Sequence, residues 1–274
     1  MNKHVGRAFV WRVLMLAVAV LIAWGLLSVP ALADMRIHTV EMALGFESPA
    51  SDLLLKRPNV RVVNEDGSGQ IYSCAADELI MLSPRESRLY WRGSSTDFQE
   101  QLQAMFAGAL ADLSPDAAAM WDEMELPDVE VRITELGSNT IAGYLAVEYL
   151  VEYNDGDEWH TLENVWVSEQ LMNEIRAELG DCIGKLSEIL SFADEALALF
   201  VTEAVVSATL HPEYKSLRET GFLMRTVSEL NMFGFAFTLE TIVREVSHEP
   251  LSDQWFAVPD GYTRVDDLGV LFGL

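Results

Sequence analysis

Residues 140–168 carry the pattern that most restricts the fold, because it fits a long antiparallel hairpin and little else. Every second residue of the first segment is apolar: Leu145, Val147, Tyr149, Val151 and Tyr153. Such alternation is typical of a strand with one buried face. Asn154-Asp155-Gly156 then gives a strong turn signal, and residues 158–168 supply the partner strand. The sequence therefore predicts an antiparallel sheet built around this hairpin.

Further short apolar segments, separated by turn residues, predict additional strands. They are residues 35–44, 59–64, 69–82, 87–92, 128–136, 221–230, 232–246 and 254–258. Residues 46–58, which contain Pro49 and Pro58, are predicted to form a loop, and Gly137-Ser138-Asn139 a turn. The runs over 59–64, 69–82 and 87–92, with turn signals between them, indicate a meander of hairpins.

Two parts of the chain change to a helical period. A helix is predicted from Ser95 or Thr96, with Thr96 and Gln99 at capping-box spacing, and a second one over 115–124. Residues 169–210 are predicted as a helical insert that Ser168 caps, Gly184 interrupts and Pro212 ends. We therefore expect one α+β domain over 34–262, followed by a loose tail over 263–274.

The first 33 residues have the order of a secretory signal peptide. Three basic residues precede an uninterrupted apolar segment over 13–27, and Ala31-Leu32-Ala33 places small residues before a cleavage point at Asp34. The alternative is an uncleaved anchor, but 15 apolar residues are fewer than the ~20 that span a bilayer. We expect cleavage, export to the periplasm and no stable membrane anchor in the mature protein.

The chain is strongly acidic. Its formal net charge is −25, and removal of residues 1–33 would leave 15 basic against 43 acidic residues, a net charge of −28. Nucleic acid is excluded as a favoured partner because phosphate binding needs clustered Lys and Arg. An acidic, Lys-poor surface suits a salty compartment, where screening weakens self-repulsion. An acidic solvated surface without salt adaptation explains the composition equally well.

The chain contains two cysteines, Cys74 and Cys182. An even number in an exported chain predicts one disulfide. Two buried free thiols are the alternative, because free Cys packs as a small apolar residue.

No arrangement of residues predicts catalysis. The four histidines after residue 33 are widely spaced, and the chain contains no HExxH, GxSxG, P-loop or GxGxxG motif. We therefore predict a protein that is not an enzyme and holds no metal or other cofactor.

Three segments resemble an uncharacterised group of exported bacterial proteins, which is related in fold to lipoprotein carriers of the LolA, LolB and LppX type. They are Thr140-Ile141-Ala142-Gly143-Tyr144, Val165-Trp166-Val167-Ser168 and the F-x-V-P-x-G-Y ending over 256–262. The chain departs from the pattern in its long helical insert, in its acidity and in lacking a lipid-anchoring Cys.

The resemblance implies a strongly curved, half-open antiparallel β-barrel with helices packed on its concave face. An apolar cavity between sheet and helices would then hold a lipid, an acyl chain or an acylated protein. The candidate lining residues are Tyr149, Trp166, Met224, Phe233, Phe235 and Phe237. The alternative is that these residues form an ordinary core packed against the helix predicted over 186–208, which is what an apolar stripe usually indicates. A structural module that binds another cell-envelope protein is the alternative function.

Overall fold

The computed structural model describes residues 34–43, 46–47, 50–113, 127–156, 158–185, 203–232 and 235–272. The predicted signal peptide, the predicted helix over 115–124 and most of the predicted helix after Gly184 lie outside these residues. The chain divides into two units, Met1–Ala33 and Asp34–Leu274. Everything below concerns the second unit.

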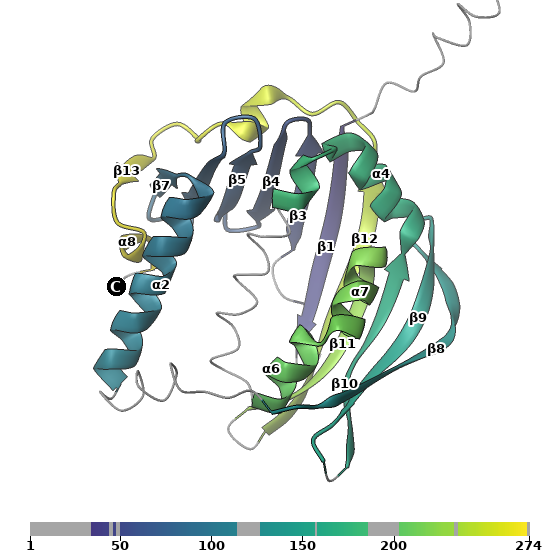
Figure 1. The fold of residues 1–274 in the computed structure, drawn as a ribbon. Coiled ribbons are helices and arrows are strands. Elements are labelled where there is room, and N and C mark those ends of the chain that lie inside the picture. Colours follow the sequence, from purple (N-terminus) through teal and green to yellow (C-terminus); the bar gives the residue numbers. More distant parts are fainter. Residues whose placement is uncertain are drawn as a thin grey trace, which may run out of the picture. The chain divides into compact units, whose positions relative to one another are not determined.

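The described residues form one thirteen-stranded sheet that is antiparallel apart from one short pair (Figure 1). Its strands run in the order β13-β7-β6-β5-β4-β3-β1-β12-β11-β10-β9-β8, with β2 paired to β1. The strands β13 and β8 are its two edges, so backbone hydrogen bonds do not close the sheet. The bounds are β1 Met35–Ala43, β2 Phe46–Glu47, β3 Ser51–Lys56, β4 Asn59–Asn64, β5 Gly69–Ser73, β6 Glu78–Leu82, β7 Leu89–Gly93, β8 Glu130–Ile141, β9 Tyr144–Asn154, β10 Trp159–Ser168, β11 Phe222–Met232, β12 Phe235–Ser247 and β13 Thr263–Val265.

Strand β1 joins the two halves of the sheet. It pairs with β3 of the N-terminal meander on one side and with β12 on the other. The sequence predicted β1 as a strand but predicted residues 46–58 as a loop, and this second expectation was wrong. The prolines lie outside the strand, because Pro49 precedes β3 and Pro58 lies in the turn after it. The apolar triplet Leu53-Leu54-Leu55 between them is free to pair.

The predicted hairpin is β9–β10. Its turn is Asn154-Asp155-Gly156, in which Asn154 Oδ1 accepts a hydrogen bond of 2.9 Å from the Gly156 backbone N–H. The turn predicted at 137–139 was wrong, because β8 continues through it with a bulge between Glu135 and Gly137. The chain reverses instead at Ala142-Gly143, where both residues have positive φ angles of 49° and 88°. Consecutive positive φ angles are what a tight hairpin turn requires.

The described helices are α2 Ser95–Leu113, α4 Glu169–Leu179, α6 Glu203–Leu210, α7 Pro212–Thr220, the 3-10 helix η2 Asp253–Phe256 and α8 Gly269–Phe272. The start of α2 was predicted correctly, but its cap is Ser94 rather than Thr96. Ser94 Oγ and Asp97 Oδ2 each bind the other residue's backbone N–H, at 3.1 and 2.8 Å. Ser168 caps α4 as predicted, its side chain accepting from the Leu171 N–H.

Pro212 does more than end a helix. α6 ends at Leu210, and Pro212 opens α7 at the first helical position, with His211 as N-cap. Proline suits this position because its missing N–H would have no helical partner there. The sequence analysis predicted no helix over 212–220, so α7 is a correction.

The main core lies between the sheet and the helices α2 and α4. Phe98 and Leu102 of α2 share one buried cluster with Leu171, Ile175 and Leu179 of α4. The strand members of this cluster come from both halves of the sheet: Met35, Ile37, Leu55, Val60, Tyr72, Leu79, Trp91, Tyr144, Ala146, Trp166, Met224 and Val243. Both helices therefore bury apolar faces against strands that are far apart in the sequence.

The C-terminal segment packs against the other side of β5–β7. Phe256, Val258 and Tyr262, which carry the F-x-V-P-x-G-Y motif, pack against the buried residues Ile71, Ile80 and Leu82. Residues 254–258 were predicted as a strand, but the structure has the 3-10 helix η2 there. This short helix is capped by Ser252, whose side chain accepts from the Gln254 N–H.

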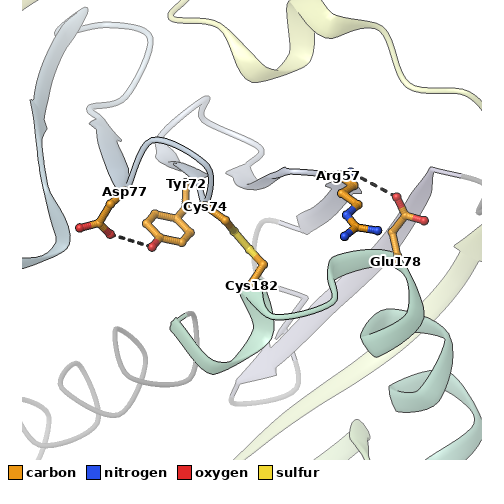
Figure 2. The surroundings of a disulfide bond; sticks show 6 residues. All are labelled: Arg57, Tyr72, Cys74, Asp77, Glu178 and Cys182. Atoms are coloured by element: carbon orange, nitrogen blue, oxygen red, sulfur yellow. Dashed lines mark hydrogen bonds between the residues drawn. A yellow bond between two sulfur atoms is a disulfide. The ribbon is translucent and has the colours of Figure 1, made fainter.

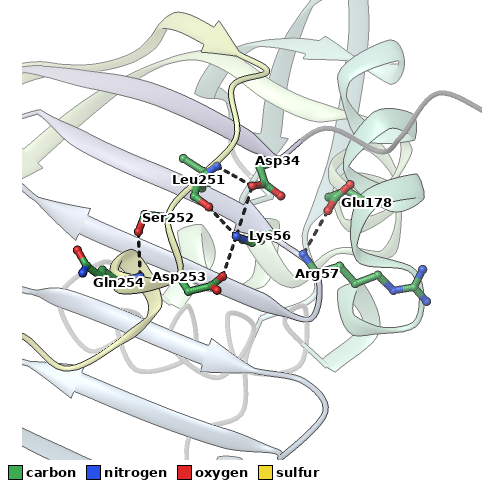
Figure 3. Close-up of polar contacts among 8 residues, drawn as sticks. All are labelled: Asp34, Lys56, Arg57, Glu178, Leu251, Ser252, Asp253 and Gln254. Carbon is green, nitrogen blue, oxygen red and sulfur yellow. Dashed lines mark hydrogen bonds and ion pairs between the residues drawn. The ribbon is translucent and has the colours of Figure 1, made fainter.

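Polar contacts fix the same segment to β3 and β4. Lys56 Nζ donates to the Leu251 carbonyl at 2.6 Å and pairs with Asp253 at 2.7 Å, and Asp34 Oδ2 accepts from the Leu251 N–H at 2.6 Å (Figure 3). The Arg61 side chain donates to the Trp255 carbonyl. The first described residue of the unit is thus anchored by a segment over 200 residues away in sequence.

Residues 263–272 are part of the fold, in contrast to the loose tail predicted. Thr263–Val265 pairs in parallel with β7 as the edge strand β13. Leu268 is fully buried in the main core, and its N–H donates to Gln101 Oε1 of α2 at 2.8 Å. The apolar residues of this segment, at positions 265, 268 and 270–272, follow neither a strand nor a helix period, so no periodic pattern revealed the pairing.

Candidate functional site

Of the candidate cavity residues whose side chains the structure describes, two lie together and the third lies elsewhere. Trp166 and Met224 belong to the main core, with exposed fractions of 6% and 0%. Tyr149 is half-buried and packs against a different apolar cluster. Phe233 lies outside the described residues. For Phe235 and Phe237 the structure describes the backbone in β12, opposite Met232 and Leu230, but not the side chains.

Strand register separates Tyr149 from Trp166. Tyr149 lies directly opposite Val165, whereas Trp166 lies opposite Glu148. Because neighbouring side chains of a strand point to opposite faces, Tyr149 and Trp166 project from opposite faces of the sheet. The expectation that they line one cavity together is therefore wrong for this pair. The alternation within one strand does not record which residues of the neighbouring strand share its face.

The Trp166 indole contacts one charged side chain in addition to the apolar core. The guanidinium carbon of Arg225 lies 4.5 Å from the centre of the Trp166 ring, within the range of a cation–π contact. Arg225 Nε also pairs with Glu240 at 2.8 Å. Trp166 is thus a core residue with Arg225 against its ring.

The face that carries Tyr149 presents a second apolar cluster beneath α7, which we call the Tyr149 surface. Four of its residues are buried, Val151, Val165, Val167 and Tyr214. Six further apolar side chains pack around them and remain partly exposed: Val131, Ile133, Tyr149, Leu162, Leu217 and Leu223. They come from α7 and from the strands β8–β11. Partly exposed apolar residues gathered around a buried centre are what an apolar binding surface requires.

Acidic groups border the Tyr149 surface. The pKa of the Tyr149 hydroxyl is raised, first by burial and then by the negative charges of Glu135 and Glu169. Glu163 lies on the same strand face between Val151 and Ser228, and Ser228 Oγ donates to its carboxylate at 3.2 Å. The surface therefore combines an apolar floor with carboxylates at its margin.

A disulfide joins Cys74 to Cys182, as the cysteine count predicted (Figure 2). It links the turn between β5 and β6 to the segment that follows α4. Beside it, Glu178 of α4 is only 4% exposed and accepts a hydrogen bond of 3.2 Å from the Arg57 backbone N–H. With Ser168 capping its first turn, α4 is held to the sheet at both ends.

A polar cluster that the sequence did not reveal lies at the start of β9. The Tyr144 hydroxyl lies 2.7 Å from Glu174 Oε2 of α4 and 2.9 Å from Nε2 of His248. Burial, and then the hydrogen bond to Glu174, raise the pKa of the Tyr144 hydroxyl. Tyr144 belongs to one of the three motifs noted in the sequence, but no spacing pattern connects it with His248. The cluster ties α4 to two separate strand ends.

Within the described residues, no group of three or more His, Cys, Asp and Glu side chains is placed to hold a metal ion. No helix among them has the length and apolarity needed to cross a bilayer.

No protein-family model and no curated protein matches this chain. Among solved structures, the lipoprotein LppX of Mycobacterium tuberculosis matches at 10% identity and a TM-score of 0.30, over 79% of this chain and 88% of that one. A LolA superfamily protein of Nitrosomonas europaea matches at 11% identity and a TM-score of 0.24, over 83% and 91%. A domain assigned to outer-membrane lipoprotein sorting, from Vibrio parahaemolyticus, matches at 9% identity and a TM-score of 0.24, over 83% and 90%.

These structures are of the LolA and LppX type to which the sequence motifs pointed.

Proposed function

We propose that this protein is a non-enzymatic periplasmic carrier that binds a lipid, an acyl chain or an acylated protein on the Tyr149 surface, between the sheet and α7. The observation that carries the proposal is the composition of that surface. Six partly exposed apolar side chains surround four buried ones, and α7 contributes both Tyr214 and Leu217 to them. An acyl chain lying there would gain about 0.8 kcal/mol for each CH₂ group removed from water.

The proposal includes the shape of the sheet, a strongly curved half-open barrel with the helices α2 and α4 on its concave face and with α7 and the Tyr149 surface on the opposite face. The curvature of the sheet is supported by the contacts of α4, which touches both β3 and β9. Five strand spacings separate these two strands in the sheet order, which is about 24 Å in a flat sheet. An 11-residue helix is only about 16 Å long. Contact with both strands is expected if the sheet curves around α4.

The proposal also includes export with cleavage after Ala33. Asp34, the first residue of the mature chain, accepts the hydrogen bond from Leu251 and lies 3.8 Å from Lys56 Nζ. The N-terminal residue of the mature chain would thus be held in place by its contacts with Leu251 and Lys56. We expect the intact mass of protein isolated from the periplasm of an expressing bacterium to correspond to residues 34–274. A protein that retains residues 1–33 in the membrane fraction would contradict cleavage.

Uptake of a neutral fluorescent probe tests the carrier function. We expect N-phenyl-1-naphthylamine to gain fluorescence when added to the mature protein, because its rings leave water. Leu217→Gln places a polar group in the Tyr149 surface and should weaken binding about tenfold, since it removes roughly 1.5 kcal/mol of apolar contact. Leu145→Gln is the matched control, because Leu145 is already exposed outside this surface.

The result would contradict the proposal if the wild-type protein took up no probe, or if both variants weakened binding equally while remaining folded by circular dichroism. Absence of uptake would favour the second candidate, a module that binds another envelope protein. The observation behind that candidate is the unpaired edge of β8, near which Leu136 and Leu145 are exposed.

A further inference from the structure

Arg61 is a buried cation at the point where β4 meets the C-terminal segment. Its side chain belongs to a residue that is only 6% exposed. Arg61 lies on the face of the sheet opposite the main core, because Val60 belongs to that core and Arg61 is paired with Ile71, which packs beneath the C-terminal segment. A buried charge is costly unless it is paired and fully hydrogen-bonded.

The Arg61 guanidinium uses few of its hydrogen-bond donors. A guanidinium has five N–H groups, and here Nη1 donates to the Trp255 carbonyl. Nε is enclosed and has no hydrogen-bond partner among the described residues. The guanidinium carbon lies 5.8 Å from the centre of the Trp255 ring, within the range of a cation–π contact. An enclosed donor without a partner points to a water or an ion bound beside it.

Three other cations on this face have carboxylate partners. Strand register places Arg36, Lys56 and Arg92 on the same face as Arg61. Their ion pairs are Arg36 with Asp52 at 2.7 Å, Lys56 with Asp253 at 2.7 Å and Arg92 with Glu78 at 3.4 Å. Arg61 is more deeply buried than any of these three cations.

The groups that act on Arg61 include no carboxylate of the described chain. Burial lowers the pKa of the Arg61 guanidinium, the Tyr262 hydroxyl opposes this shift, and the positive charge of Arg85 adds to it. Arg85 and Trp255 are both exposed, so the guanidinium lies just beneath the surface. Arg61 and Arg85 therefore place two positive charges near each other on a chain that is otherwise strongly acidic.

The position of Arg85 is set by the turn between β4 and β5. Its side chain lies against Gly67, where a Cβ atom would be 2.4 Å from the Arg85 Cγ. Arg85 also acts on Asp66, whose Oδ1 accepts from the Ser68 N–H at 2.8 Å and from the Ser68 hydroxyl at 2.6 Å. Asp66 offsets part of the charge of Arg85 but is not among the groups that act on Arg61.

We propose that Arg61 is the buried end of a binding site for a phosphate group, with Arg85 at its rim. A guanidinium binds the oxygens of a phosphate or carboxylate through two parallel hydrogen bonds. Two arginines favour phosphate, because a phosphate monoester carries about −1.5 to −2 charges at pH 7 and a carboxylate carries one. The site is separate from the Tyr149 surface, which lies on β8–β11 and α7, so the inference does not rest on the carrier function.

Thermal unfolding of the mature protein tests the site. Inorganic phosphate and glycerol 3-phosphate are the ligands, and acetate and chloride at the same ionic strength are the references. We expect either phosphate to raise the melting temperature by about 5 °C at a concentration ~100 times its dissociation constant. Acetate should raise it by much less. Phosphate salts also stabilise proteins generally, through exclusion from the protein surface, so the response must be shown to depend on Arg61.

Substitutions supply that comparison. Arg61→Met should fold, because an apolar side chain of similar size in place of an unpaired buried charge is often neutral or stabilising, and it should lose the saturable response to phosphate. Arg61→Lys keeps the charge without the planar fork and should weaken binding several-fold. Arg36→Gln is the matched control, since it removes one positive charge from the same face where the arginine has its own carboxylate. It should keep the wild-type response.

Equal responses of the wild-type protein and Arg61→Met would overturn the proposal, because the stabilisation would then be a general effect of the salt. A response to acetate as large as the response to phosphate would overturn the choice of phosphate. If Arg61→Met does not fold, calorimetric titration of the surface variant Arg85→Gln decides. We expect it to bind glycerol 3-phosphate several-fold more weakly than the wild-type protein, and an unchanged affinity would overturn the proposal.

Vesicles distinguish a lipid headgroup from a soluble phosphate ester. The wild-type protein and Arg61→Met are sedimented with phosphatidylcholine vesicles that contain phosphatidic acid, whose headgroup is a phosphate monoester. Co-sedimentation that Arg61→Met abolishes would support the proposal and assign a lipid headgroup. Binding of glycerol 3-phosphate without co-sedimentation would support it and assign a soluble ester, whereas binding of neither would overturn it.

Discussion

Replacing both cysteines, as Cys74→Ala/Cys182→Ala, is expected to lower the free energy of unfolding by about 4–5 kcal/mol. The disulfide joins residues 108 positions apart, and a loop of that length has a large closure entropy in the unfolded chain. The same bond holds the segment after α4 to the β5–β6 turn, so its loss also releases that end of the helix. Urea unfolding of the mature protein, followed by circular dichroism, measures the change.

Reduction supplies the control for the cysteine variant. Dithiothreitol should shift the unfolding midpoint of the wild-type protein toward lower urea and leave the variant unaffected. A variant whose stability falls by less than about 1 kcal/mol would show that the cross-link contributes little beyond the packing of Cys182 in the core.

The second large effect is expected from Leu171→Ala, which should cost about 2–5 kcal/mol. Leu171 lies in the first turn of α4 and has an exposed fraction of 0%. Its side chain belongs to the cluster that joins α4 to both halves of the sheet, so truncation leaves a cavity where the helix meets the strands. The measurement is again the free energy of unfolding in urea.

Leu145→Ala is the comparison for this substitution. It deletes the same atoms from β9, where the leucine is 58% exposed, and should change stability by less than about 0.5 kcal/mol. Similar costs for the two variants would mean that α4 does not pack against the sheet as described. A large cost for Leu171→Ala alone supports the position of α4 as a structural element of the core.

Features that depend on neighbouring residues could be predicted from the sequence. The β9–β10 hairpin follows from alternation and a turn whose Asn154 side chain bonds its own backbone. The cap of α4 follows from Ser168 before a helical period. Each of these is a local preference that acts over a few residues, so one sequence is enough to reveal it. The disulfide was predicted differently, from an even cysteine count in a chain expected to be exported.

Features that depend on contacts between distant segments were decided only by the tertiary structure. Residues 263–265 become a strand because β7 offers a free edge about 170 residues earlier in the chain, which no local pattern records. The arrangement of the candidate site was likewise decided by contacts between distant segments. Tyr149 and Trp166 are both aromatic strand residues, and only the pairing of β9 with β10 places them on opposite faces.

The sequence by itself thus determined which segments form the long hairpin, where α4 begins and which sulfur atoms pair. The tertiary structure decided which side chains share a face, and with that the apolar and acidic character of the Tyr149 surface. Strand pairing decides this because successive side chains of a strand point to opposite faces of the sheet. A shift of one residue in register therefore moves every side chain of the strand to the other face. The register depends on both paired strands and on the turn between them, so the pattern of one strand alone does not specify which residues of its neighbour share its face.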